Sequence, residues 1–224
     1  MKLRNQIALI ADDDEFFRMA LSTILTNKLE FAEVVQAASL DEAVEKLSAR
    51  SDISLALFDL AMPGMESPAN LRAVRDCFEK LRVAVVSSSK NRRDVLSALE
   101  AGVHGYVPKG LGVADLARAL QLIVDGVIYV PPWITTLPSA GQEHAAPPRA
   151  AATSPRSALA ILTPRQRGVL ALLVEGKSNK AIARDLDLGE GTVKVHMAAL
   201  FRSLGVSTRT AAAVAGGRLL RPAG

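Results

Sequence analysis

The first 130 residues alternate short apolar runs with amphipathic stretches, and this alternation limits the possible folds more than any other feature of the sequence. Five apolar runs have the length and hydrophobicity of buried strands, at residues 6–11, 32–37, 54–58, 82–86 and 105–107. Helical periodicity fills the segments that follow them, at residues 15–29, 40–50, 68–78, 92–101 and 111–125. Strict alternation of this kind predicts a parallel sheet with helices on both faces.

The expected fold of residues 4–128 is therefore α/β, a flavodoxin-like doubly wound five-stranded parallel sheet. In such folds functional groups gather beyond the carboxyl ends of the strands, where the strand order reverses. The periodic pattern ends near Pro131, and Pro, Ala, Ser and Thr dominate the sequence that follows. This composition predicts a flexible linker over residues 129–158.

Residues 159–224 carry helix signals only and predict a small all-α domain of four helices. Thr163 and Gln166 form a capping box that includes a first-turn proline, Pro164, and Ser39 and Glu42 form a capping box without a proline in the first half. A helix ending near Leu186, a short turn through residues 187–189, and a helix over residues 190–203 have the layout of a helix-turn-helix. A fourth helix is expected from Thr208 to Leu219.

Charge differs between the two halves of the chain. The net charge is +4, but residues 1–130 hold 15 Lys and Arg against 18 Asp and Glu, whereas residues 155–224 hold 11 against 4. A basic domain suits a polyanion such as DNA, and a solvated surface is the alternative explanation. A single cysteine and the lack of a long apolar run predict a cytoplasmic protein with no disulfide and no membrane contact.

Acidic residues follow two of the predicted strands. Asp12, Asp13 and Asp14 come after the first strand and Asp59 ends the third, so their carboxylates should converge at one edge of the sheet. Hard, clustered oxygen ligands suit Mg²⁺, and a metal beside Asp59 would let that carboxylate act as a nucleophile toward phosphorus. Ser87 and Lys109 follow strands four and five, where they can contact a phosphoryl group.

Four sequence blocks resemble the receiver-domain signature of response regulators: IADD at 10–13, DLAMPGM at 59–65, SSS at 87–89 and AGVHGYVPK at 101–109. The resemblance implies that Asp59 accepts phosphate from a sensor histidine kinase. It also implies that Asp12 and Asp13 bind Mg²⁺ together with Asp59 and the Ala61 carbonyl. Ser87 and Tyr106 would form a switch pair, with Ser87 moving toward the phosphate and the Tyr106 ring turning inward.

Two positions depart from the family pattern. Asp14 stands where this subgroup usually has His, and Ser67 stands where it usually has Gly. A third carboxylate at position 14 could alter metal affinity, or it could face solvent or cap the first helix. No catalytic group is missing, so phosphorylation is the expected input and a receiver that acts without it is the alternative.

Three further blocks, LTPRQRGVL at 162–170, GKSNKAIA at 176–183 and GTVKVH at 191–196, resemble the LuxR-type domain of the NarL/FixJ subfamily. The resemblance places the helix-turn-helix at residues 177–196, with the helix from Glu190 entering the major groove of double-stranded DNA. The last helix resembles the dimerisation helix of the family, which implies a homodimer on activation. Gly216 and Gly217 would weaken that helix by about 1 kcal/mol each.

Helical spacing divides the residues of the recognition helix between two faces. The spacing directs four apolar residues into the domain core: Val193, Met197, Leu200 and Leu204. The opposite face presents Thr192, Lys194, Val195 and Ala198 to DNA, where Lys194 can reach phosphate or guanine. Ser178 and Lys180 are expected to contact phosphate. His196 either packs or contacts the DNA backbone.

The predicted function is a phosphorylation-controlled DNA-binding transcriptional regulator of a two-component system, not an enzyme. A remote alternative is a Mg²⁺-dependent phosphatase that forms an aspartyl phosphate. Enzymes of the haloacid-dehalogenase type place the nucleophile on the first strand, in an Asp-x-Asp-x-Thr block. The segment from Asp12 to Phe16 lacks that threonine.

Overall fold

A computed structural model describes residues 6–65, 68–135 and 162–220. The chain divides into two compact units, Met1–Pro131 and Pro132–Gly224. Tyr129, at the start of the predicted linker, still belongs to the first unit, because its carbonyl accepts a hydrogen bond from the Tyr106 backbone at 2.9 Å. A short helix, η1 (Pro132–Thr135), follows. The remainder of the predicted linker, residues 136–158, lies outside the described residues.

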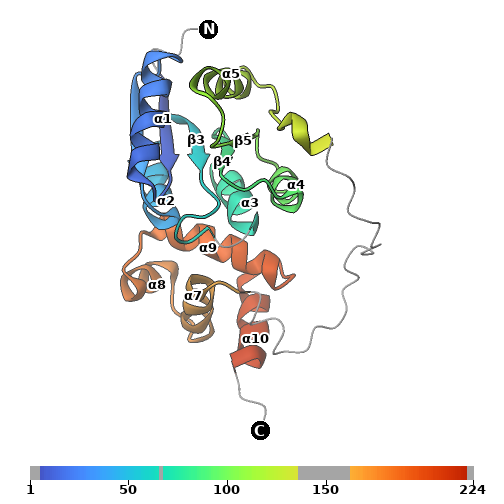
Figure 1. Cartoon of the computed structure of the whole chain (residues 1–224). Helices are drawn as coiled ribbons and strands as arrows, with labels where there is room; N and C mark the ends of the chain where they lie inside the picture. Colours follow the sequence, from blue (N-terminus) through green and yellow to red (C-terminus); the bar gives the residue numbers. More distant parts are fainter. Residues whose placement is uncertain (1–5, 66–67, 136–161, 221–224) are drawn as a thin grey trace. The chain divides into compact units, whose positions relative to one another are not determined.

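The first unit contains the predicted five-stranded parallel sheet, in the order β2-β1-β3-β4-β5 (Figure 1). The strands are β1 (Ile7–Ala11), β2 (Glu33–Ala37), β3 (Ile53–Phe58), β4 (Arg82–Ser87) and β5 (Tyr106–Pro108). Each helix follows its strand as expected: α1 (Glu15–Asn27), α2 (Leu40–Ala49), α3 (Pro68–Cys77), α4 (Arg92–Glu100) and α5 (Val113–Val124). The doubly wound α/β prediction is confirmed.

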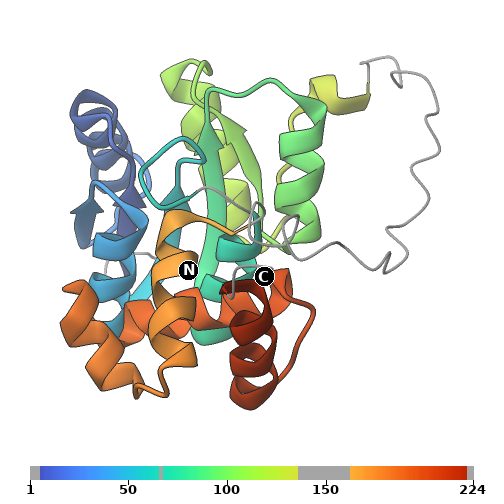
Figure 2. The same cartoon turned by 90° about the horizontal axis from the view of Figure 1, so that it is seen from below.

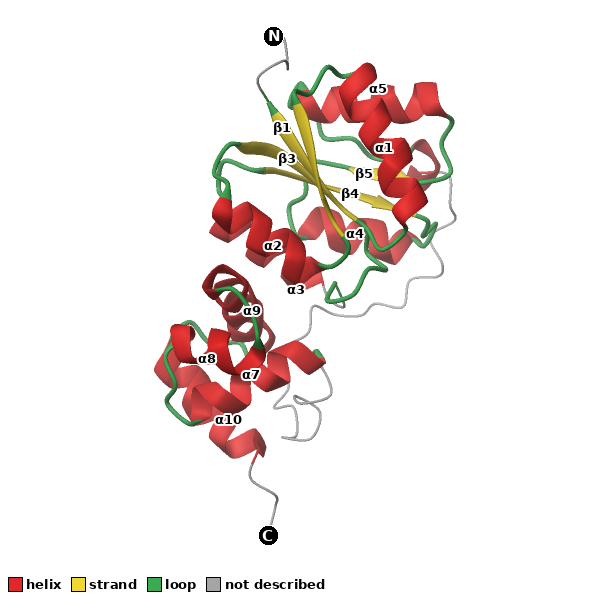
Figure 3. Ribbon diagram, turned by 90° about the vertical axis from the view of Figure 1, so that its left-hand side faces the viewer, coloured by secondary structure: helices red, strands yellow, loops and turns green. Residues whose placement is uncertain are grey.

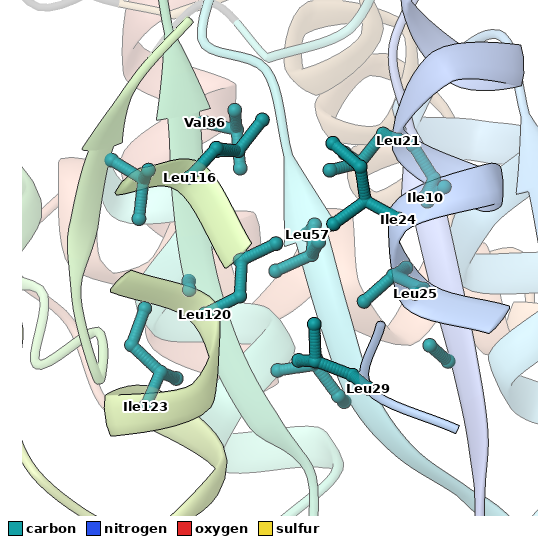
Figure 4. Close-up of a cluster of buried hydrophobic side chains, with 14 of the residues drawn as sticks. Ile10, Leu21, Ile24, Leu25, Leu29, Leu57, Val86, Leu116, Leu120 and Ile123 are labelled. Carbon is teal, nitrogen blue, oxygen red and sulfur yellow. The ribbon is translucent and has the colours of Figure 1, made fainter. Parts of the chain in front are cut away.

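Helices cover both faces of this sheet, with α1 and α5 on one face and α2, α3 and α4 on the other (Figure 3). Under α1 and α5, the apolar residues of β1, β3 and β4 meet the inner faces of the two helices in one buried cluster (Figure 4). Its largest members include Ile10, Leu25, Leu57 and Leu120, each at most 1% exposed. Burial on both faces explains why these strands read as continuous apolar runs.

The second unit contains four α-helices in the part of it that the structure describes: α7 (Pro164–Val174), α8 (Asn179–Leu186), α9 (Glu190–Ser203) and α10 (Arg209–Leu220) (Figure 2). The capping box of Thr163 and Gln166 is present at the start of α7. Asp187 ends α8 with a left-handed φ of 54°, which makes the tight turn into α9. The helix-turn-helix layout is confirmed.

The core of the second unit contains the apolar face that the sequence assigned to α9. Val193, Met197 and Leu200 are buried in one cluster with residues of α7 and α8, and Leu204 packs against its edge. Helix α10 closes the cluster through Ala212, which is fully buried. The core face predicted for α9 is confirmed for these four residues.

Gly216 of α10 is buried against α7, and this position corrects the expectation that both terminal glycines only weaken the helix. A Cβ atom at residue 216 would lie 2.4 Å from Leu170 Cδ1 and 2.8 Å from Val174 Cγ2. A Cβ atom at Gly217 would meet nothing within 4 Å. Gly216 therefore permits the close approach of α10 to α7. Gly217 lowers the helix propensity of α10, and no close contact requires a glycine there.

The two glycines should respond to alanine with opposite signs. Gly217→Ala should raise the free energy of unfolding of the C-terminal unit by about 1 kcal/mol, through helix propensity. Gly216→Ala gains the same propensity but forces the buried Leu170 side chain to move, and overpacking costs about 1 to 3 kcal/mol. We expect a net loss for Gly216→Ala in urea unfolding followed by circular dichroism. Equal stabilisation by both variants would contradict the close approach.

Candidate functional sites

The acidic cluster lies at the carboxyl edge of the sheet because β1 and β3 are adjacent and in register. Ala11 pairs with Phe58, so Asp12 and Asp59 leave the two strands at the same level. Asp12 is 1% exposed and Asp59 is 4% exposed. One carboxylate oxygen from each of Asp12, Asp13 and Asp59 lies within 4.8 Å of the others. The structure thus brings together three of the four carboxylates that the sequence expected to converge.

Lys109 provides a positive charge inside this cluster. Its Nζ lies 2.7 Å from Asp12 Oδ2 and 3.0 Å from Asp59 Oδ2. The backbone positions it, because Lys109 N–H donates to the Ser87 carbonyl at 2.9 Å just beyond the pairing of β4 with β5. The ammonium therefore offsets the repulsion between two buried carboxylates that stand side by side.

Burial and this ion-pair network shift two pKa values in the cluster. Burial raises the pKa of the Asp12 carboxyl above its ordinary value, and the hydrogen bond from Lys109 only partly opposes that effect. For Lys109, burial lowers the pKa, but the hydrogen bonds and charges of Asp12 and Asp59 outweigh it and the pKa is raised. Lys109 is consequently a fixed cation at neutral pH.

The donor set is suited to a hard cation. Asp59 Oδ1 is buried and has no hydrogen-bond donor among the described residues, although its partner oxygen binds Lys109. Asp13 is exposed beside it. Carboxylate oxygens with access to water are the ligands that Mg²⁺ prefers, so an acidic cluster of this composition is typical of a receiver Mg²⁺ site. Ala61, the predicted carbonyl ligand, lies in the exposed loop after β3.

Asp14 has a structural role. Its side chain accepts a hydrogen bond from the Phe17 backbone at 3.1 Å and caps α1. It does not belong to the cluster of Asp12, Asp13 and Asp59. Of the alternatives left open by the sequence, two are observed together, because Asp14 is exposed to solvent and also caps the first helix.

The predicted switch residues share a hydrogen-bonded network with two residues that the sequence did not single out. Tyr106 is fully buried, and its hydroxyl donates to the Ser89 carbonyl at 2.9 Å. The Ser89 hydroxyl contacts Asp94 of α4 at 2.5 Å, and the Ser87 hydroxyl accepts from the Ser89 backbone at 3.2 Å. Burial raises the pKa of Tyr106 despite hydrogen bonds to Ser87 and Ser89. The loop after β4 thus joins both switch residues to α4.

Two residues in the first turns of α1 also support the acidic cluster and were missed. Arg18 donates to the Asp12 carbonyl at 2.7 Å and to the Gln36 side chain at 3.3 Å. The Phe17 ring lies below the Lys109 ammonium, 4.7 Å from Nζ to the ring centroid. Their position three and four residues after the capping Asp14 was the available signal, since the first turn of α1 must lie beside the loop that carries Asp12.

The residues predicted to contact DNA occupy α8 and α9. Ser178 caps α8 by accepting from the Ala181 backbone at 3.2 Å, and Lys180 and Lys194 are exposed. Thr192, Val195 and His196 have little exposed surface, and none of them belongs to the hydrophobic cluster of the domain core.

Arg209 of α10 is a further residue that the sequence did not single out. Its guanidinium donates to the Asn179 side chain at 2.9 Å and to the Lys177 carbonyl. This pair of bonds ties α10 to the start of the helix-turn-helix. The Lys177 ammonium in turn pairs with Asp185 at 2.7 Å.

Comparison with known proteins identifies both units. Residues 8–121 match the family of response regulator receiver domains, and residues 160–215 match the bacterial regulatory proteins of the luxR family. The chain is 35% identical to the glycerol metabolism activator of Pseudomonas putida over 93% of its own length and 94% of the relative's. The chain belongs to the response regulators. It is also 32% identical to the nitrate/nitrite response regulator NarL of Escherichia coli K12, over 92% of both chains.

Solved structures agree with the fold of this response regulator. A LuxR-family response regulator from Aurantimonas matches 58% of the chain and 92% of that structure, at a TM-score of 0.53 and 25% identity. RcsB from Salmonella enterica serovar Typhimurium, bound to promoter DNA, matches 95% of the chain and 98% of that structure. Its TM-score is 0.53 and its identity 21%, so this likeness concerns the fold alone.

Membership in this family makes the chain a DNA-binding transcriptional regulator with an acidic phosphorylation pocket. The phosphatase alternative is wrong, because the matched families are regulators and not enzymes. A receiver domain implies a histidine kinase as partner. Within the described residues, no helix of the response regulator is long and apolar enough to span a membrane.

Proposed function

We propose that Asp59 of this response regulator accepts the phosphoryl group of a sensor histidine kinase in the cytoplasm, and that this transfer controls binding of the C-terminal helix-turn-helix to promoter DNA. The single observation that supports the acceptor role is the environment of Asp59. This buried carboxylate has one oxygen bound to a lysine and the other without a donor among the described residues, beside two more carboxylates.

Asp12, Asp13 and Asp59, with the Ala61 carbonyl, would bind Mg²⁺ in this pocket. When bound, the metal supplies positive charge that neutralises the phosphoryl oxygens as they approach the carboxylates. The carboxylate of Asp59 forms a new bond to phosphorus while the bond from phosphorus to the donor breaks. The electron pair of that bond leaves with the donor, which is the imidazole of a phosphohistidine or the acetate of acetyl phosphate.

Lys109 and Ser87 would contact the arriving phosphoryl group. Lys109 is already held beside Asp59, so its charge is in place before the transfer. Ser87 ends β4 and pairs with Pro108, the residue before Lys109, and its hydroxyl can donate to a phosphoryl oxygen. Movement of Ser87 would disturb the Ser89 backbone that accepts from Tyr106, which supports the role of Ser87 and Tyr106 as a switch pair.

The output half supports a role in double-stranded DNA binding through residues 177–196. Lys180 and Lys194 are exposed cations on α8 and α9, and Ser178 is exposed at the N-cap of α8. Thr192 belongs to the proposed contact set, with little of its surface exposed. Val195 and His196 complete the proposed contact set on α9. The RcsB structure contains promoter DNA, and this chain shares its fold. Helix α10 (Arg209–Leu220), which was expected at residues 208–219, is proposed to form the homodimer on activation.

Incubation of the protein with Mg²⁺ and acetyl phosphate tests the acceptor role. The expected product carries one phosphoryl group that hydroxylamine removes, as an acyl phosphate requires, and reductive trapping should place it at residue 59. DNA affinity measured before and after this treatment tests the coupling. Strong DNA binding that does not change with labelling would instead favour a receiver that acts without phosphorylation.

Lys194→Ala should weaken DNA binding by removing one phosphate or guanine contact from α9. In the variant, the slope of log affinity against log salt concentration should be smaller in magnitude by about one unit. The matched control is Lys80→Ala, which removes an exposed cation from the receiver domain. A salt titration by fluorescence anisotropy measures both variants. An unchanged slope and affinity for Lys194→Ala would remove this residue from the contact set.

A further inference from the structure

The Lys109 ammonium lies between two carboxylates and an aromatic ring. Asp12 and Asp59 contact it at 2.7 and 3.0 Å, and the ring of Phe17 lies 4.7 Å from it. The ring is supported on its other side, because the partly buried Phe17 packs against the buried cluster between the sheet and helices α1 and α5. Lys109 therefore extends between a packed aromatic ring and the acidic cluster.

An aromatic ring in this place restricts a lysine that is otherwise flexible. The four-carbon stem of lysine gives the ammonium many positions, and the negative face of an aromatic ring attracts the cation. Only 13% of the Lys109 side chain is exposed, so water competes little with the attraction between the ammonium and the ring. The ring favours the positions in which the ammonium remains over the carboxylates.

We propose that Phe17 is a positioning residue for phosphoryl transfer, whose ring holds the Lys109 ammonium against Asp59 where the arriving phosphoryl group requires a cation. The inference rests on the proposed transfer to Asp59 and adds a residue to its machinery. Phe17 touches none of the reacting atoms, and it acts only through Lys109.

The chain provides a matched control in the neighbouring residue. Phe16 has the same side chain and lies in the same turn of α1, but it is 80% exposed and stands away from the buried cluster. Phe16→Leu therefore removes a ring of equal size from the same turn without altering the surroundings of Lys109. Phe17→Tyr retains the ring face, and Phe17→Leu retains apolar packing without a ring.

Nuclear magnetic resonance of the full chain tests the contact directly, without metal or phosphodonor. With lysine labelled at the ε-carbon, the ring current of Phe17 should shift the Lys109 ε-methylene protons upfield from those of exposed lysines. The shift should persist in Phe16→Leu and Phe17→Tyr and disappear in Phe17→Leu. An ordinary lysine position in the wild-type protein would overturn the proposal.

The rate of labelling by acetyl phosphate in saturating Mg²⁺ tests the consequence. Phe17→Leu should be slower by about three- to tenfold, the factor that a partly desolvated cation–π contact provides. Phe17→Tyr should stay within about twofold of the wild type, and Phe16→Leu should match it. Mg²⁺ affinity, measured by calorimetry, should be as high in Phe17→Leu as in the wild type, and an unchanged melting temperature should accompany it.

Two results would overturn the proposal while leaving Asp59 as acceptor. One is a wild-type rate for Phe17→Leu. The other is a slow rate accompanied by an equal loss of Mg²⁺ affinity, because that would place the defect in the acidic cluster itself. A wild-type protein that takes no label would overturn the proposed transfer and this inference together, so the two failures are distinguishable.

Discussion

Replacement of Asp59 by asparagine is expected to reduce phosphoryl labelling to the background level. The amide has nearly the same shape as the carboxylate but is not a nucleophile toward phosphorus, and it withdraws one of the three clustered carboxylates. Autoradiography or intact-mass measurement after incubation with acetyl phosphate and Mg²⁺ gives the result. Label retained by Asp59→Asn would show that the acceptor is another residue.

The same variant should fold at least as stably as the wild type, so that loss of labelling cannot be attributed to unfolding. Burial is the main cause of the raised pKa of Asp12, and the charge of the neighbouring Asp59 adds to it, which indicates repulsion between the two carboxylates. Asp59→Asn removes this repulsion, while Lys109 keeps its ion pair with Asp12. Asp125→Asn is the matched control, because this exposed carboxylate at the end of α5 lies outside the acidic cluster, and it should label normally.

Lys109→Met is expected to have the opposite effect on stability. The methionine has a similar length but leaves Asp12 and Asp59 buried together without their cation. Breaking a buried ion pair by removing one partner costs about 3 kcal/mol or more. Urea unfolding near neutral pH should show this loss, and added Mg²⁺ should recover more stability in the variant than in the wild type. A variant as stable as the wild type without metal would contradict the pairing.

The pH dependence of the stability of Lys109→Met follows from the direction in which the pKa of Asp12 is shifted. Burial already raises the pKa of Asp12 in the folded protein, and loss of the Lys109 hydrogen bond raises it further. A carboxyl with a raised folded pKa binds more protons in the folded than in the unfolded state, so stability falls as the pH rises through that pKa. The deficit of the variant should therefore be largest near neutral pH and shrink in acid.

The positions of the main pocket residues could be predicted because they depend on topology alone. Ser87 ends a strand of the parallel sheet and Asp12, Asp59 and Lys109 each follow one, and the carboxyl ends of such strands meet at one edge whatever the side chains are. The strand pattern therefore predicts that these residues lie together. The capping residues helped in the same way with the helical domain, since Thr163 caps α7 and Ser178 caps α8, the first helix of the helix-turn-helix.

Contacts made by single rotamers could not be predicted in this way. The bond from Ser89 to Asp94 and the ring of Phe17 below Lys109 depend on the paths of a loop and a first helical turn, which periodicity does not define. Glu42 illustrates the limit even within a known motif. Ser39 caps the Glu42 backbone as expected, but the Glu42 carboxylate accepts from the Ala38 N–H instead of from Ser39.

The acceptor for the Tyr106 hydroxyl is a main-chain carbonyl, that of Ser89. A side-chain acceptor can be deleted by one nucleotide change, whereas a peptide carbonyl is present with every amino acid at that position. The bond should thus tolerate substitutions at residue 89. It should be sensitive instead to changes that redirect the loop, such as the loss of Asp94, which accepts from the Ser89 hydroxyl. Mutations that alter signalling should accordingly map to the supports of this loop more often than to the residue that provides the oxygen.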